Sequence, residues 1–388
     1  MVLDRTLDKG TPEEDFAALV DSVKRSPQFV HILVELLQER NPVYTGRSAN
    51  ATTRMRGYVL ATFETVGVPD TALPFLVEEL ESGRDAYVVA AAAKALRGSR
   101  VREPWIVQLL LKAIENIRYK DDVVTFDDYK PTWPSSRHIT TALAEIFKTL
   151  EWLGPDAAIA LPDLEAFAAG AESLPATTRA ALAQAIAVVK VEKVTRKASC
   201  CAGPHIPIKH LQPIHHEHGM AGSSLPVGVR FEDQDGRNVT YGEVFTGQPT
   251  VVVFFYTRCN NPNKCSLTIT KLAKLQHALG PAGLTGAVHT AAITYDPEFD
   301  IPSRLKAYGL NRGAIFDSDH CFLRAVTGFK TLTDYFELGV SYGQAAVNRH
   351  KIEAFILDNR GRIDASFQRL QWDVGELVKG AERLVRPG

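Results

Sequence analysis

The sequence predicts a chain of two unlike domains, an all-α N-terminal half and an α/β C-terminal half. Its 388 residues exceed the size at which one hydrophobic core usually stops growing. Apolar residues recur at helical spacing in the first half, whereas buried strands alternate with helices in the second. A Cys- and His-rich segment with interspersed prolines separates the two patterns. We therefore predict domains at 1–191 and 225–388, joined by a linker at 192–224.

Amphipathic helices fill residues 1–191. One apolar stripe contains Phe29, Ile32, Leu33, Leu36 and Leu37, and others lie near Leu60, Leu76, Leu96, Leu109, Leu143 and Leu182. The segment GVPDTALPFL at 67–76 returns as GPDAAIALPDL at 154–164, and 85–96 supplies a partner helix. This repeat resembles HEAT repeats and predicts an α-solenoid. An alanine-rich helical bundle is the alternative.

One segment, residues 118–136, interrupts these helices. It carries Phe126, Tyr129 and Trp133 among several aspartates. A long loop with aromatic residues could be a binding finger or an insertion packed against its own domain. We expect the second arrangement.

Composition and charge narrow the classes of function. Forty-four basic residues balance forty-five acidic ones, which argues against a nucleic-acid partner. The sequence lacks the features of a signal peptide and any apolar run of roughly 20 residues that could span a membrane. We expect a cytoplasmic protein. Five clustered cysteines in a reducing compartment favour metal or redox chemistry over a disulfide-stapled fold.

The linker concentrates thiols and imidazoles in a short stretch. These candidates for a second metal site are Cys200, Cys201, His205, His210, His215, His216 and His218, with Met220 beside them. They could form a site of their own or a strap that transfers metal to the following domain. The alternative is a flexible linker that binds metal only adventitiously.

The C-terminal pattern begins with strands at 229–231 and 238–240 and a helical turn at 241–245. A strand at 251–256, buried on both faces, precedes a helix that begins near Leu267. A strand at 291–295 and a helix at 305–308 follow, then a hairpin at 352–357 and 362–367 and a helix at 373–384. This order predicts a thioredoxin-like domain. Residues 316–326 are predicted to be helical, with Cys321 a buried thiol.

Cys259 and Cys265 lie where the buried strand ends and the helix begins. Free amides and the helix dipole at such a point stabilise a thiolate, so both are candidate catalytic thiols. A metal site, a disulfide and two ordinary loop thiols all remain open. Asp296 and Asp300 follow the next strand, and we expect them to cap the helix after it, with orientation of a ligand histidine as a second role.

Three motifs occur in order in this region: FFYTRC at 254–259 followed by Cys265, ITYDPEFD at 293–300, and His350 ahead of IEAFILD at 352–358. Together they resemble the SCO/SenC family of thioredoxin-fold copper proteins, over roughly residues 225–388. The resemblance implies that Cys259, Cys265 and His350 bind copper, and that the protein helps to load the copper site of a respiratory oxidase or reduces its thiols. The family usually places three residues between its cysteines, and this chain has five.

Two thiolates and an imidazole form a soft ligand set that suits Cu(I), and also Cu(II) or zinc with a further ligand. Our leading hypothesis is a copper-binding thiol-redox protein whose solenoid docks a protein partner. One alternative is an enzyme, either a copper-dependent oxidase or a thiol oxidoreductase acting on a small thiol or a peptide. The other is an interaction scaffold with a degenerate thioredoxin-like domain. The sequence does not predict the oligomeric state.

Overall fold

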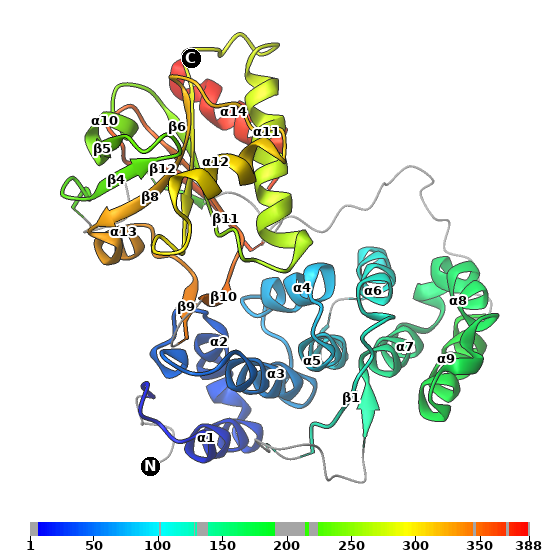
Figure 1. The fold of residues 1–388 in the computed structure, drawn as a ribbon. Coiled ribbons are helices and arrows are strands. Elements are labelled where there is room, and N and C mark those ends of the chain that lie inside the picture. The colour runs from blue at the N-terminus through cyan, green and yellow to red at the C-terminus, as the bar shows by residue number, and fades with distance from the viewer. Residues whose placement is uncertain are drawn as a thin grey trace. The chain divides into compact units, whose positions relative to one another are not determined.

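The computed structural model describes residues 7–100, 102–127, 129, 139–190, 214–216, 224–343, 347–369 and 372–386 (Figure 1). The chain divides into two compact units. The first comprises Met1–His210 with Tyr342–Gln344, and the second comprises Leu211–Ser341 with Ala345–Gly388. In the described part of the chain, no helix combines the length and apolar character needed to cross a membrane.

The first unit is helical, as predicted. Its helices are α1 (Glu13–Arg25), α2 (Val30–Leu37), α3 (Ala49–Val66), α4 (Leu73–Ser82), α5 (Ala86–Leu96), α6 (Pro104–Ile117), α7 (Ala142–Leu153), α8 (Leu161–Ala168) and α9 (Ala176–Val189). Each odd-numbered helix packs against the next odd-numbered one, and α4 packs against α6. Alanines at 90–93 of α5 are fully buried, and their small side chains let α3 and α7 approach from both sides.

The insertion packs against its own unit where the structure describes it. Its stem is closed by the antiparallel pair β1 (Val123–Val124) and β2 (Thr140–Thr141). Phe126 packs on Tyr87, with ring centres 5.0 Å apart, and Tyr129 packs edge-on against Tyr58 at 5.4 Å. These two aromatics therefore pack on helices α5 and α3 of their own unit. Trp133 lies outside the described residues.

The second unit is an α/β fold around one large sheet, which confirms the predicted class. The strand order is β3-β12-β11-β6-β7-β8-β4-β5. The strands are β3 (Ile214–His215), β4 (Arg230–Asp233), β5 (Asn238–Thr240), β6 (Thr250–Phe255), β7 (His289–Thr294), β8 (His320–Thr327), β11 (Glu353–Leu357) and β12 (Ile363–Gln368). The three central strands β6, β7 and β8 are parallel, and β11 joins β6 antiparallel. The smaller pair β9 (Val340–Tyr342) and β10 (Val347–His350) lies outside this sheet.

Helices cover the sheet on both faces. They are α10 (Tyr241–Phe245), α11 (Leu267–Leu279), α12 (Pro302–Leu310), α13 (Phe329–Tyr335) and α14 (Val374–Val385). Val251, Val253 and Phe255 of β6 share one core with α11 and α14, which lie side by side (Figure 1). Phe254 points to the opposite face, where it meets Phe336 at the end of α13. Both faces of β6 are thus buried, as its unbroken apolar run predicts.

The helix predicted at 316–326 is wrong, because residues 320–327 form strand β8. This strand pairs parallel with β7 and antiparallel with β4, so its backbone groups are bonded on both sides. Sheet pairing of this kind outweighs the local spacing of apolar residues. Cys321 consequently lies near the start of β8 and is only partly buried.

Candidate metal centre

The loop after β6 is held by the buried carboxylate of Asp300. This carboxylate accepts a hydrogen bond from the Thr257 amide at 3.0 Å and further bonds from the hydroxyls of Thr257 and Thr294. Burial raises the pKa of Asp300. The predicted capping role is wrong, since α12 has Ile301 at its N-cap and no side-chain cap. Asp296 instead pairs with Arg258, the residue before Cys259.

The second cysteine lies in a π-helical turn, Pro262–Ser266, that leads into α11. The Asn261 side chain starts this turn by accepting a hydrogen bond from the Asn263 amide at 3.0 Å. Lys264 has non-helical dihedral angles, φ −114° and ψ −108°, which mark a kink directly before Cys265. The turn accommodates the extra residues of the loop and leaves Cys265 only 1% exposed, whereas Cys259 is partly exposed.

Strand register brings His350 to the same place. Because β11 runs antiparallel to β6, with Ala354 opposite Val253, the segment preceding β11 lies at the carboxyl end of β6. There the imidazole packs edge-on against Tyr256, with ring centres 5.3 Å apart, and lies beside Tyr295 at 5.4 Å. The Tyr295 hydroxyl donates to the buried carboxylate of Glu353 at 2.8 Å, which fixes this wall of the site.

The His350 Nε2 atom lies 3.6 Å from Cys259 Sγ and 3.4 Å from Cys265 Sγ. Its Nδ1 atom lies 3.2 Å from the carbonyl oxygen of Lys351. A carbonyl oxygen only accepts, so this contact favours a proton on Nδ1, and Nε2 is the ring nitrogen that faces the two sulfurs. The three side chains form one group whose ligand atoms all lie within 4.8 Å of one another.

This group fits a metal ion. With metal–nitrogen bonds of about 2.0 Å and metal–sulfur bonds of about 2.3 Å, two ligands of one ion lie about 3 to 4 Å apart. The distances from Nε2 to the two sulfurs fall in that range. In the ranges that the structure describes, this is the one group of three or more His, Cys, Asp or Glu side chains with such geometry.

The two thiols have unequal acidity. A hydrogen bond from Cys265, assisted by His350, lowers the pKa of Cys259 to about 3 against the cost of burial. Burial, with the hydrogen bond to Cys259 as a second cause, raises the pKa of Cys265 well above its ordinary value. The metal-free site therefore holds one thiolate and one thiol. Desolvation raises the pKa of Cys321 to about 12, in a different part of the sheet.

Most of the linker candidates, namely Cys200, Cys201, His205, His210 and His218, lie outside the described residues, as does Met220. The structure places His215 and His216 at the outer edge of the sheet, against β12. His216 Nε2 lies 3.0 Å from Ser366 Oγ, and His215 Nδ1 lies 3.3 Å from an Arg383 nitrogen. Three strand spacings, roughly 14 Å, separate β3 from β6, so these two imidazoles do not join the cysteines.

Several residues that shape the site were not singled out in the sequence. Tyr256 and Tyr295 enclose the imidazole, and Lys264 donates through Nζ to the His350 carbonyl oxygen at 3.1 Å. A signal exists for the two tyrosines, because each directly follows a buried central strand. No local signal marks Lys264 as buried, because a lysine in a polar loop is ordinarily exposed.

Comparisons with known proteins agree with the C-terminal motifs. The family model described as SCO1/SenC matches residues 226–386, which supports this family for the C-terminal region. A search of curated proteins finds no match to the chain.

Solved structures similar to this region include a SCO1/SenC family lipoprotein from Bacillus anthracis, 21% identical, covering 40% of this chain and 92% of that one, with a TM-score of 0.36. ScoI of Bradyrhizobium japonicum with copper bound is 22% identical, and the match covers 40% of this chain and 96% of that one, with a TM-score of 0.34. ScoI of Arabidopsis thaliana with copper bound is 20% identical, and the match covers 41% of this chain and 96% of that one, with a TM-score of 0.35.

The unequal thiols predict selective alkylation of the metal-free, reduced protein. An ordinary thiol with a pKa of about 8.5 loses thiolate about tenfold for each pH unit below that value. Because the pKa of Cys259 is lowered to about 3, its thiolate persists as the pH falls from 8 to 5.5. We expect iodoacetamide to modify Cys259 at nearly the same rate across this range and Cys265 and Cys321 hardly at all, as measured by peptide mass spectrometry.

Cys321→Ser is the control and should leave the Cys259 profile unchanged. A Cys259 rate that falls about a hundredfold or more between pH 8 and 5.5 would contradict the assignment of the thiolate.

Proposed function

We propose that this chain is a copper-binding thiol-redox protein of the SCO/SenC type, with Cys259, Cys265 and His350 as the copper ligands. The observation that carries the proposal is the position of His350 Nε2, 3.6 Å and 3.4 Å from the two sulfurs. The match of residues 226–386 to the SCO1/SenC model supports it. So do the solved relatives described with copper bound.

The donor set favours Cu(I) over zinc. Two thiolates and one imidazole complete a near-trigonal Cu(I) site, whereas structural zinc takes four ligands. Among the described residues the group contains three such side chains, so zinc would need a ligand from solvent or from elsewhere. Copper held here would be cargo for a client site. Cys259 is its accessible ligand, and the buried Cys265 and His350 keep water from the other side.

A second function, thiol–disulfide exchange, is supported by the unequal thiols. The partly exposed Cys259 thiolate would attack a substrate disulfide, forming a mixed disulfide and releasing one substrate thiolate. Cys265 would lose its proton to the released substrate thiolate. It would then attack the Cys259 sulfur of the mixed disulfide and release the second substrate thiolate. Two electrons thereby pass to the substrate, and a Cys259–Cys265 disulfide remains for a dithiol reductant to reopen.

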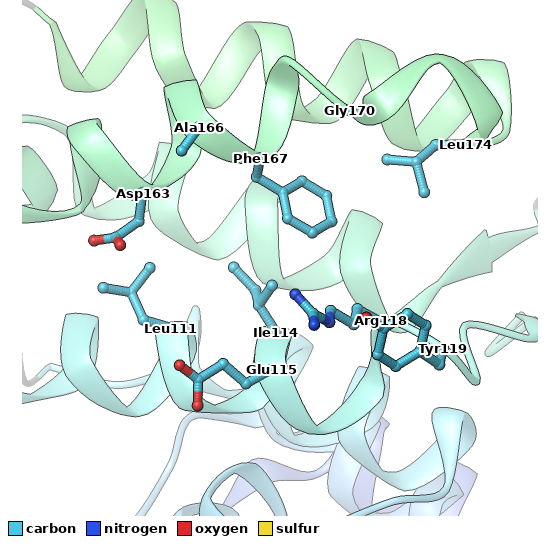
Figure 2. A pocket seen from close by; sticks show the side chains of 10 residues that line it. All are labelled: Leu111, Ile114, Glu115, Arg118, Tyr119, Asp163, Ala166, Phe167, Gly170 and Leu174. Carbon is cyan, nitrogen blue, oxygen red and sulfur yellow. The ribbon is translucent and has the colours of Figure 1, made fainter.

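We also propose that the helical unit, assigned to residues 1–191, is a HEAT-like solenoid that docks a protein partner. Packing of α1, α3, α5, α7 and α9 in succession supports a repeat architecture. A groove of about 570 Å³ lies between α6 and α8 (Figure 2). Leu111, Ile114, Phe167 and Leu174 give it an apolar floor.

Charges at the two ends of the groove specify the partner. Figure 2 shows Glu115 and Asp163 toward one end and Arg118 with Tyr119 toward the other. Tyr119 is 83% exposed, and the Arg118 guanidinium lies 4.5 Å from its ring centre. The occupant that fits is a segment of a partner protein with an apolar side chain between an acidic residue, facing Arg118, and a basic one.

The cytoplasmic location of the chain stays a prediction.

Copper loading tests the leading proposal. We expect about one Cu(I) per chain in reduced protein after anaerobic loading and removal of excess metal, measured by elemental analysis. Cys259→Ser, Cys265→Ser and His350→Ala each remove a ligand and should retain less than about a tenth of that copper. Cys321→Ser should bind like the wild type. Equal retention by all four variants would reject these ligands.

Disulfide turnover tests the second function. With dithiothreitol as reductant, a model disulfide peptide should be reduced faster by the metal-free protein than by reductant alone. Cys259→Ser should abolish the acceleration, since it removes the attacking thiolate. Reduced Cys265→Ser, mixed with the peptide after removal of dithiothreitol, should retain the mixed disulfide. No acceleration by a fully reduced wild-type protein would exclude this function and leave copper binding intact.

A displayed peptide library, selected against the full chain, tests the groove. We expect enriched peptides to carry an acidic residue, an apolar anchor and a basic residue in series, and Arg118→Glu to remove the preference for the acidic residue. Arg102→Glu is the control, because Arg102 stacks on Trp152 in the same unit and does not line the groove. Peptides that bind equally well to the Arg118→Glu variant would place docking elsewhere.

A further inference from the structure

Lys264 is a buried cation inside the loop that joins the two cysteines. The residue is 8% exposed, and its ammonium donates a hydrogen bond to the backbone carbonyl of His350 at 3.1 Å. The residue is the direct neighbour of Cys265, and it lies at the kink of the π-helical turn. One side chain therefore links the cysteine loop to the histidine segment, although 86 residues separate them in sequence.

Burial of an ammonium is unfavourable unless nearby negative charge compensates it. Lys351, on the other side of His350, has such compensation from the Glu353 carboxylate at 3.2 Å. Lys264 donates to the backbone carbonyl of His350 and directly precedes the ligand Cys265, so its positive charge lies at the metal-ligand group. The positive charge of Lys264 also opposes the burial effect on the pKa of Cys265. Lys264 is thus electrostatically part of the site.

The formal charge of the site depends on the metal. Two thiolates and a neutral imidazole carry −2, so the group becomes −1 with Cu(I) and neutral with Zn(II). The Lys264 ammonium repels a divalent ion about twice as strongly as a monovalent ion at the same position, so it penalises Zn(II) more than Cu(I).

We propose that Lys264 is a specificity-determining residue, which makes the Cys259–Cys265–His350 group prefer Cu(I) over divalent ions such as Zn(II). The inference rests on the proposed function and deepens it. Lys264 has two separable actions: its hydrogen bond positions His350 against the loop, and its charge sets the preference between metals. Loss of positioning alone lowers the affinities for both metals together, whereas loss of charge changes the ratio of the Cu(I) affinity to the Zn(II) affinity.

The ratio of Cu(I) to Zn(II) affinity distinguishes these two actions. Lys264→Gln keeps a hydrogen-bond donor and removes the charge, Lys264→Met removes both, and Lys264→Arg keeps the charge. Affinities are measured on reduced protein by competition with bicinchoninate for Cu(I) and with a chromophoric chelator for Zn(II). We expect the ratio to fall about tenfold or more in the Gln and Met variants and to change less than about threefold in the Arg variant.

Lys271→Met is the matched control, because Lys271 also donates to a backbone carbonyl, that of Trp372 at 2.9 Å, but belongs to α11. Its ratio should equal that of the wild type. Thermal unfolding of each metal-free variant checks that it is folded. An unchanged ratio in folded Lys264→Gln overturns the inference while copper binding by the wild type upholds the proposed function. If the wild type binds no Cu(I), both fail.

Discussion

The antiparallel pairing of β11 with β6 is the interaction on which the candidate metal centre depends. His350 lies 91 residues after Cys259, and this pairing brings its segment to the carboxyl end of β6. A shift of one residue would move the histidine segment by about 3.3 Å and reverse the faces of the β11 side chains. Fully buried residues on both strands, such as Val253 and Ala354, resist such a shift, so the core determines the geometry of the site.

Two buried carboxylates hold the irregular backbone around this pairing. Segments that leave a sheet lose ladder hydrogen bonds, and their polar groups need other partners. Asp300 supplies them for the loop after β6, through Thr257 and Thr294. Glu353 accepts from the Gly339 amide and the Tyr295 hydroxyl and pairs with Lys351. Cys259 and His350 therefore project from segments that are fixed on each side, which preorganises the ligand atoms.

Most elements of the fold could be predicted from the sequence, because their signals are local. The apolar run of β6, the turn signal between β11 and β12 and the stripe of α11 each lie within a few residues. Strand β8 could not, since its strand character comes from β7 and β4 on either side. For the site, the strand-to-helix position of Cys259 and Cys265 is a local signal. The third member, His350, was identified only through a family resemblance, because its approach depends on long-range register. The functions of Asp300 and Lys264 depend on contacts 43 and 86 residues away.

The spacing of the two cysteines is where this chain differs from the usual SCO/SenC pattern. Five intervening residues could have moved the second sulfur away from the first, but the π-helical turn returns Cys265 to the start of α11. The ligand atoms thus stay within 4.8 Å of one another, and the longer loop changes the surroundings of the metal site instead of its donors. Its main effect is to bury one lysine directly before Cys265 in the chain and bond it to the histidine segment. Topology therefore explains which side chains meet, whereas the loop determines the electric field in which they meet. Because that field acts differently on ions of different charge, the loop between the cysteines is where this chain can tune its choice of metal while keeping the same ligands.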